Sequence, residues 1–276
     1  MSAPARNPIF DRMNIRLFIF DWDGTALGGH EPYDRFPPGF VCFLDGLQKR
    51  GIRWVTNTTW SLENQFKVIR ESGVKSSPVF LAGSSGRILG AVTGNKLKID
   101  PAYMRRICML DRRFFTRFGP LMRRIAARLL REELADQVYF NPYGHHYMSF
   151  HFRNAGLARR GWKIAAPLLK PGIMYRAFRP GDSVSDDSLM PFYMNKGAVI
   201  DYLRRRLGLR PEEILVAGDG FNDLHMFDPR RAKWMVCPAN AHPLVKNQVR
   251  KHGGLVSKLN YSHGVVEAAT RILSAI

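Results

Sequence analysis

The stretch Leu17-Phe18-Ile19-Phe20-Asp21-Trp22-Asp23-Gly24-Thr25 decides the fold. Its first four residues are all apolar, which predicts a short strand buried on both faces. Two carboxylates follow where that strand must end, and Gly24 allows the chain to turn sharply. Ligands of open α/β sheets bind beyond the carboxyl ends of the strands. Taken alone, the stretch fits a solvated acidic turn as well as a site for a cation or a proton.

The segments on either side of this strand predict a doubly wound, Rossmann-like α/β core with a parallel sheet. Helical spacing of apolar residues over 38–50 and 61–72 alternates with short apolar runs at 52–55 and 79–82. Such alternation of strand and helix is typical of βαβ units. Ser61 is expected to cap the second of these helices.

The pattern changes after the third strand, which predicts an inserted domain. A hairpin over 87–99, a long helix over 116–135 and further short strands indicate an α/β domain with antiparallel strands. Core-like segments then resume, with helices at 196–207, directly after Asp223, at 243–251 and at 264–275, and with strands at 214–217 and 234–237. We expect residues 1–86 and 188–276 to form the core and residues 87–187 to form the inserted domain.

The composition indicates the class of protein and the cellular compartment in which it is expected. Its 276 residues are 45% hydrophobic, enough for a substantial core. The three cysteines are scattered without metal-ligand spacing, so we expect reduced, mostly buried thiols and a cytoplasmic setting. No apolar run approaches membrane-spanning length, which predicts no membrane association through a spanning helix.

The net charge of +19 suggests an anionic partner. Residues 87–187 contain 19 Lys and Arg against 8 Asp and Glu, so the inserted domain carries much of this charge. Nucleic acid, an anionic membrane and phosphorylated small molecules all fit a basic surface. No stretch of basic residues interleaved with stacking aromatic residues is evident, so nucleic-acid binding stays an alternative supported by charge alone.

Polar side chains gather at the predicted strand ends and at one helix start. They are Asp21, Asp23, Thr56, Asn57, Lys196, Asp219, Asn222 and Asp223. The carboxyl ends of parallel strands meet at one edge of a sheet, so these side chains are expected to converge. Carboxylates suit a hard cation such as Mg²⁺, and a hydroxyl and an ammonium suit phosphoryl oxygens. One carboxylate can attack phosphorus while another transfers the proton, so the set suits phosphoryl transfer.

Four motifs in this order resemble the signature motifs of the haloacid dehalogenase superfamily. They are Asp21-Trp22-Asp23-Gly24-Thr25, Thr56, Lys196 and Gly218-Asp219-Gly220-Phe221-Asn222-Asp223. Together with Asn195-Lys196-Gly197-Ala198 and Asn240-Ala241, the last motif resembles the Cof-type and sucrose-phosphate-phosphatase-like branch. That branch carries a large α/β cap domain, and the resemblance covers roughly residues 13–86 and 188–276.

The resemblance implies a Mg²⁺-dependent phosphatase acting on a small phosphorylated metabolite, and we expect this metabolite to be a sugar phosphate. It implies that Asp21 is the nucleophile and a metal ligand. Asp23 would be the general acid and base, with its backbone carbonyl on the metal. The remaining metal ligands would be Asp219 and Asp223. A carboxylate at the position of Asp23 favours phosphate chemistry over carbon–halogen cleavage.

The resemblance further implies phosphoryl contacts from Thr56, Lys196 and Asn222. Asn57, which follows Thr56 at the strand end, is expected either to contact the phosphoryl group of the substrate or to cap the next helix. The sequence departs from the branch in the bulk of Trp22 and in lacking Gly-Arg after Thr56. It departs also at Gly83-Ser84-Ser85-Gly86, so the substrate stays open. His145 and His146 are weak candidates for substrate contact. The alternatives are a phosphotransferase on the same core and a basic nucleic-acid-binding protein that retains a phosphatase-like fold.

Overall fold

The computed structural model describes residues 15–140, 148–165, 167–168, 176–177, 188–190 and 195–275. The chain divides into two compact units, which are treated separately below. Unit 1 comprises 1–86, 90–98 and 196–276, and unit 2 comprises 87–89 and 99–195. Within the described residues, no helix has the length and apolar character needed to cross a membrane.

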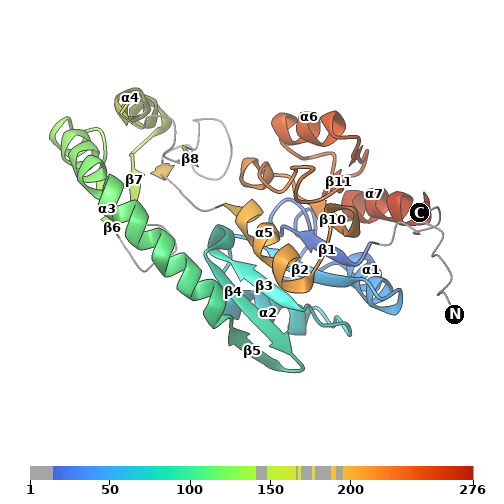
Figure 1. The fold of residues 1–276 in the computed structure, drawn as a ribbon. Coiled ribbons are helices and arrows are strands. Elements are labelled where there is room, and N and C mark those ends of the chain that lie inside the picture. Colours follow the sequence, from blue (N-terminus) through green and yellow to red (C-terminus); the bar gives the residue numbers. More distant parts are fainter. Residues whose placement is uncertain are drawn as a thin grey trace, which may run out of the picture. The chain divides into compact units, whose positions relative to one another are not determined.

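Unit 1 is built on an eight-stranded sheet with the order β12-β11-β10-β1-β2-β3-β4-β5 (Figure 1). The strands are β1 (Leu17–Phe20), β2 (Arg53–Asn57), β3 (Phe80–Gly83), β4 (Ile88–Thr93), β5 (Lys96–Ile99), β10 (Ile214–Ala217), β11 (Trp234–Cys237) and β12 (Leu255–Val256). All residues of β1 are buried, as its unbroken apolar run predicts. The pairings from β12 through β3 are parallel.

The sheet has its topological switch point beside β1. The chain adds β2 and β3 on one side of β1 and β10, β11 and β12 on the other. In register, Leu17 pairs with Arg53 of β2 and with Ile214 of β10. Ligand sites of doubly wound folds lie at such a point, outside the carboxyl ends of the strands. The segment after β1 therefore occupies the position at which a site is expected.

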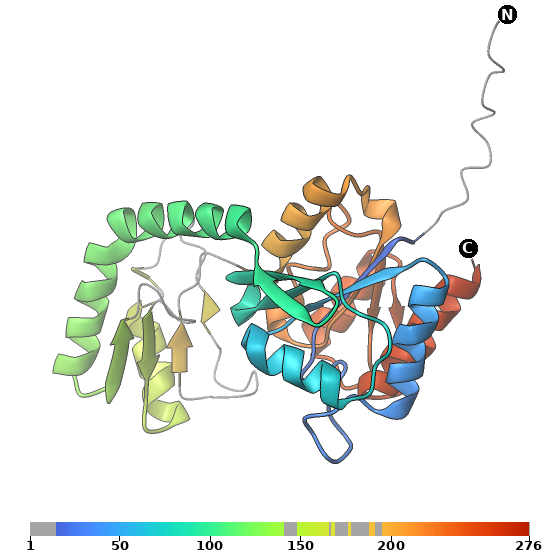
Figure 2. The ribbon, with the colours of Figure 1, turned by 90° about the horizontal axis from the view of Figure 1, so that it is seen from below.

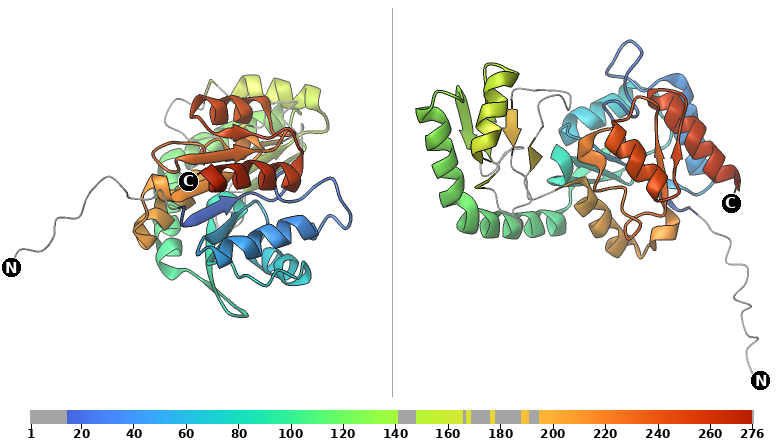
Figure 3. Two further views of the ribbon diagram at one scale, coloured as in Figure 1. Left: turned by 90° about the vertical axis from the view of Figure 1, so that its right-hand side faces the viewer. Right: turned by 90° about the horizontal axis from the view of Figure 1, so that it is seen from above.

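Five α-helices are described in unit 1: α1 (Pro38–Lys49), α2 (Leu62–Glu71), α5 (Lys196–Leu207), α6 (Pro243–Lys251) and α7 (Tyr261–Ala275). The Ser61 hydroxyl accepts the Asn64 N–H at 3.2 Å, so the predicted cap of α2 is confirmed. Figure 3 shows α6 and α7 on opposite faces of the sheet beside β11 and β12. Two faces covered by helices explain why the central strands are apolar throughout.

Unit 2 has a four-stranded sheet in the order β6-β7-β9-β8, with antiparallel pairings. Its elements are α3 (Pro101–Arg131), β6 (Gln137–Phe140), β7 (Met148–His151), α4 (Ala155–Ala165), β8 (Arg176–Ala177) and β9 (Ser188–Met190). A separate apolar cluster that includes Phe114, Ile125 and Phe150 forms its core. Figure 2 shows α3 bending partway along its length, as a helix with an internal proline, here Pro120, tends to do.

Several expectations about unit 2 and its boundaries need correction. The helix predicted over 116–135 begins at Pro101, because the Asp100 carboxylate caps it by accepting the Tyr103 N–H at 2.9 Å. The β4–β5 hairpin extends the sheet of unit 1, so most of it lies outside the inserted domain. Residues 188–195 group with unit 2, since β9 pairs with β7 and β8.

Three further expectations are also wrong, two of them about unit 1. The segment after β10 forms a single 3₁₀ turn at Phe221–Asp223 in place of a full helix, and β12 adds a strand beyond β11. The thiols are free, but Cys42 and Cys108 are exposed and only Cys237 is buried. The expectation of mostly buried cysteines therefore fails, because Cys42 and Cys108 lie on exposed positions of helices.

Candidate active site

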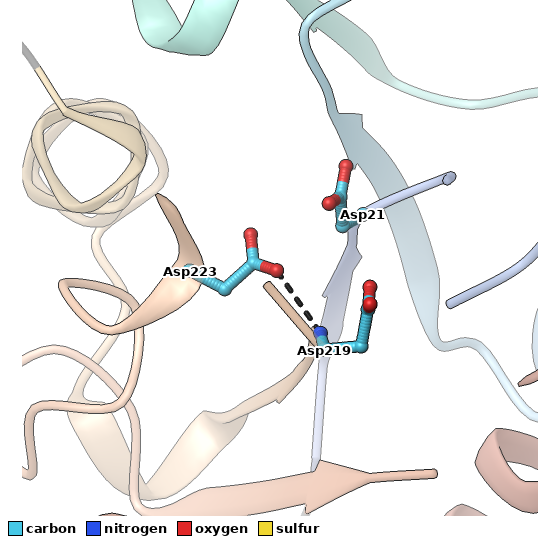
Figure 4. Close-up of side chains that lie close together, drawn as sticks. All are labelled: Asp21, Asp219 and Asp223. Carbon is cyan, nitrogen blue, oxygen red and sulfur yellow. Dashed lines mark hydrogen bonds between the residues drawn. The ribbon is translucent and has the colours of Figure 1, made fainter. Parts of the chain in front are cut away.

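Three carboxylates converge at the switch point. Asp21 directly follows β1, Asp219 lies two residues beyond β10, and Asp223 ends the 3₁₀ turn. One ligand oxygen from each lies within 4.8 Å of the others, and Figure 4 shows the three carboxylates directed into the same region. The strand ends thus bring together acids that are about 200 residues apart in the chain, as expected for a parallel sheet.

The loop after β10 is shaped by the Asp223 side chain. Its Oδ2 accepts the backbone N–H groups of Asp219 at 3.0 Å and Gly220 at 2.8 Å; the first of these bonds is drawn in Figure 4. A Cβ at Gly218 would lie 2.6 Å from Asp223, so only glycine fits there. This wrapping of the loop around one carboxylate explains the tight turn in place of the predicted helix.

The buried ammonium of Lys196 joins two of these acids. Its Nζ lies 2.6 Å from Asp21 Oδ2 and 2.7 Å from Asp223 Oδ1, and its side chain is fully buried. Lys196 is the first residue of α5, and the Asn57 amide donates to its backbone carbonyl at 3.0 Å. Asn57 therefore fixes the start of α5 and, through it, the position of the ammonium.

The electrostatics of the cluster reflect crowding of negative charge. Burial, and then the neighbouring Asp223, raise the pKa of Asp21 well above its ordinary value, against the opposing effect of Lys196. Burial and Asp223 likewise raise the pKa of Asp219 to about 7. Burial lowers the pKa of Lys196, but the carboxylates of Asp21 and Asp223 outweigh it, so the net shift is upward and the ammonium stays charged.

The donor set fits a hard divalent cation. Three carboxylates share a partly buried space with the ammonium of Lys196, so the cluster carries an excess of negative charge when all three are ionised. Isolated buried charges are costly, and a divalent ion would balance this excess. All the candidate ligands are oxygens, the type that Mg²⁺ prefers. Asp21, Asp219 and Asp223 are therefore the residues that could hold such an ion.

The loop after β1 is tied to Asp219 and to α7. Thr25 donates its hydroxyl to Asp219 Oδ1 at 2.6 Å, and a Cβ at Gly24 would lie 2.1 Å from Asp219 Oδ2. The Asn240 amide donates to the Gly24 carbonyl at 2.7 Å and accepts the Tyr261 N–H at 2.7 Å. Asn240 thus anchors the acidic loop. In the sequence, this residue was notable only because Asn240-Ala241 resembles the branch.

The carboxylate of Asp23 has two aromatic partners that the sequence did not indicate. Trp60 Nε1 donates to Oδ2 at 2.8 Å, and the Tyr33 hydroxyl donates to Oδ1 at 2.7 Å. Tyr33 lies in the loop before α1, and Trp60 lies between β2 and α2. Burial and the neighbouring Asp23 raise the pKa of Tyr33, so this phenol keeps its proton.

The remaining candidate phosphate ligands make other contacts in the structure than the sequence predicted. Successive strand residues point to opposite faces, and the Thr56 hydroxyl accordingly donates to Gln65 of α2 while Asn57 faces Lys196. Phosphoryl oxygens only accept, so Thr56 would have to give up this buried hydrogen bond to bind them. The side chain of Asn222 folds back toward Gly220, whose added Cβ would lie 2.5 Å from its Oδ1. His145 and His146 lie outside the described residues.

Comparison with known proteins gives a consistent result over nearly the whole chain. The profile of the sucrose-6F-phosphate phosphohydrolase family matches residues 15–271. The chain is similar to the mannosylfructose-phosphate phosphatase of Agrobacterium fabrum, with 26% identity over 230 residues, 83% of this chain and 85% of that protein.

Solved structures share the fold. The sucrose-phosphatase of Synechocystis sp., determined with sucrose and phosphate, superposes with a TM-score of 0.64 at 18% identity, covering 94% of this chain and 98% of that one. A phosphatase of the haloalkanoate dehalogenase superfamily from Bacteroides thetaiotaomicron gives a TM-score of 0.64 at 15% identity, covering 98% of both chains. At such identities these likenesses concern the fold alone.

Proposed function

Because the chain belongs to the sucrose-6F-phosphate phosphohydrolase family, and is therefore a phosphoric monoester hydrolase of the haloacid dehalogenase superfamily, we propose that its substrate is a small sugar phosphate. We further propose hydrolysis through a phosphoryl-Asp21 intermediate, with Mg²⁺ held by Asp21, Asp219 and Asp223. The observation that carries the proposal is the convergence of these three carboxylates, of which Asp21 and Asp223 contact the buried Lys196.

In the first step of the proposed reaction, a carboxylate oxygen of Asp21 attacks phosphorus. The bond from phosphorus to the sugar oxygen breaks, and Asp23 gives its proton to that oxygen, so the sugar leaves as a neutral alcohol. In the second step, Asp23 takes a proton from water, which attacks phosphorus and breaks its bond to Asp21. Inorganic phosphate leaves, and both carboxylates return to their starting state.

The roles of the other residues follow from their contacts. Lys196 would neutralise charge on the phosphoryl oxygens and favours the ionised form of Asp21. When bound, Mg²⁺ would supply Lewis-acid stabilisation of the charge that develops at phosphorus. Asn57 would act by positioning Lys196, and Asn222 stays a candidate for phosphoryl contact. Thr56 stays a candidate only if its bond to Gln65 opens.

Substrate choice would rest on unit 2, whose basic character suits an anionic ligand. The names of the relatives support a phosphorylated sugar, and a cytoplasmic location stays a prediction. Transfer of the phosphoryl group to an acceptor other than water is the alternative on the same core.

The test is a panel of phosphorylated sugars, including sucrose-6F-phosphate and mannosylfructose-phosphate, with release of inorganic phosphate as the readout. We expect hydrolysis with Mg²⁺, none after EDTA, and recovery when Mg²⁺ is restored. Asp21→Asn should abolish hydrolysis while Asp45→Asn, a change outside the site, should not. Turnover by Asp21→Asn at the wild-type rate would overturn the mechanism, and phosphate transferred to a sugar in place of water would favour the phosphotransferase.

A further inference from the structure

The side chain of Asp23 is held at both oxygens by donors of different chemistry. The indole N–H of Trp60 donates to Oδ2 at 2.8 Å, and the phenol of Tyr33 donates to Oδ1 at 2.7 Å. The two aromatic residues come from different connections of the sheet and belong to none of the four motifs. A carboxylate with one strong donor on each oxygen has a fixed orientation, since rotation would break both bonds.

Trp60 is the rigid partner. Its ring packs against Trp22 with a centroid distance of 5.4 Å, and Trp22, fully buried, packs against Phe36 at 5.1 Å. The backbone carbonyl of Trp60 accepts from the buried Gln65 amide at 3.0 Å and from the Ser84 N–H at 3.3 Å. Both ends of this residue are therefore tied to the packed interior of unit 1.

Tyr33 is the accessible partner. It is 41% exposed and lies in the exposed loop between β1 and α1, where its N–H donates only to the side chain of Glu31, at 3.2 Å. The two donors also differ in what they can do. An indole N–H can only donate a hydrogen bond, whereas a phenol oxygen can donate and accept.

We propose, on the basis of the function proposed above, that Trp60 and Tyr33 are positioning residues that assign the transferable proton of Asp23 to Oδ1. A proton on Oδ2 would face the Trp60 N–H, which cannot accept it. A proton on Oδ1 can be accepted by the Tyr33 oxygen while Asp23 waits for substrate. The proton then passes from Oδ1 to the sugar oxygen as the bond to phosphorus breaks, and Oδ2 keeps its bond to Trp60 throughout.

The proposal predicts that variants of Trp60 and Tyr33 lose kcat/KM to an extent that depends on the leaving group of the substrate. A sugar alkoxide leaves poorly and needs the Asp23 proton, whereas 4-nitrophenolate leaves without one. The ratio kcat/KM reports the steps through departure of the leaving group, so it isolates the step in which Asp23 acts as an acid. General acid catalysis contributes about 10²–10⁴-fold, and a misplaced acid loses part of that factor.

The experiment compares kcat/KM for the best sugar phosphate of the panel and for 4-nitrophenyl phosphate, both with Mg²⁺. Trp60→Phe keeps the ring and removes the N–H; we expect kcat/KM for the sugar phosphate to fall about 10- to 100-fold and that for the aryl ester to fall less than about threefold. Tyr33→Phe removes a hydroxyl at an exposed position and should fold normally. It should lower only the sugar phosphate value, by about 3- to 10-fold.

Two controls complete the design. Trp234→Phe removes an indole N–H that donates to the Glu212 carbonyl at 2.8 Å outside the site. This variant should leave kcat/KM unchanged for both substrates. Asp23→Asn should show the same selectivity as Trp60→Phe, with a larger loss on the sugar phosphate.

Equal losses on both substrates in Trp60→Phe and Tyr33→Phe, or no loss in either, would overturn the positioning role. If Asp23→Asn itself shows no selectivity while the wild type is active, the proposed mechanism fails. A wild type inactive on both substrates overturns both proposals.

Discussion

The ammonium of Lys196 lies 2.6 Å from Oδ2 of Asp21, and at most 5% of either side chain is exposed. The same Nζ also contacts Asp223, so one positive charge serves two buried carboxylates. Removing one partner of a buried ion pair is costly because the remaining charge has no compensation. The relationship makes Lys196 a structural residue as well as a candidate ligand for phosphate.

We expect Lys196→Met to lower the free energy of unfolding by about 3–5 kcal/mol in EDTA, since it leaves Asp21 and Asp223 crowded without a cation. Mg²⁺ should restore part of this loss. Urea unfolding with and without Mg²⁺ measures both effects, and Lys251→Met, at an exposed position, is the control. A loss that Mg²⁺ leaves unchanged would argue against a metal at these carboxylates.

Gly24→Ala should inactivate the protein for a steric reason. Gly24 has φ +76°, and its added Cβ would lie 2.1 Å from Asp219 Oδ2; Gly51 has φ +75° and open space around it. Both alanine variants bear a backbone cost of roughly 1–2 kcal/mol, but only Gly24→Ala displaces Asp219. We expect kcat to fall about 100-fold or more in Gly24→Ala and to stay unchanged in Gly51→Ala. Equal activities would contradict the close approach.

Thr56→Val tests whether the Thr56 hydroxyl binds phosphate. The substitution removes the hydrogen bond to Gln65 and should cost about 1–3 kcal/mol of stability, because it leaves a buried acceptor without its donor. We expect KM for the sugar phosphate to stay within about twofold, since the structure commits this hydroxyl to Gln65. A large rise in KM with unchanged stability would instead support the phosphate contact predicted from sequence.

Thiol reactivity should separate the three cysteines. Burial raises the pKa of Cys237 to about 12, whereas Cys42 and Cys108 are exposed. A raised pKa leaves almost no thiolate at pH 8, and the thiolate is the reactive form. Iodoacetamide at pH 8 should therefore label two sites in the folded protein and the third only in denaturant, as counted by mass spectrometry. Labelling of Cys237 in the folded state would contradict its burial.

One face of α3 should bind polyanions through charge alone. Its exposed arginines are Arg105, Arg112, Arg113, Arg117, Arg123, Arg124, Arg128 and Arg131. We expect non-specific binding of duplex DNA whose log affinity falls linearly with log salt, by roughly 10³-fold or more between 50 and 200 mM if about six phosphates are contacted. Replacing Arg113, Arg117, Arg124 and Arg128 by Gln should flatten that slope. A preference for one DNA sequence would revive nucleic acid as a specific partner.

Local patterns in the sequence predicted much of unit 1. The unbroken apolar runs of β1 and β10 and the Ser61 cap of α2 are signals carried within a few residues. The carboxylates at the strand ends could be placed together because parallel strands align their carboxyl ends. The start of α3 was missed although Asp100 and Pro101 provide a cap and a suitable first residue, because its many arginines obscure the apolar period.

The side-chain contacts that Asp23 and Gly24 make with distant residues could not be predicted. Trp60 meets Asp23 across 37 residues, and Asn240 meets Gly24 across 216. Either side chain has an ordinary local interpretation, as a core aromatic residue or as a turn residue. The direction of the Thr56 hydroxyl likewise depends on which face of the sheet α2 covers, and no short pattern records this.

The pairing of β1 with β10 also has a consequence for synthesis on the ribosome. Leu17 finds its partner Ile214 only after unit 2 has been translated in full. At a translation rate of about 5–20 residues per second, the apolar edge of β1 lacks that neighbour for roughly 10–40 s. Unit 2, which has its own core and is complete earlier, can fold during this interval. Unit 1, which contains the proposed active site, is therefore expected to be the last unit to form and the one most dependent on protection of the nascent chain.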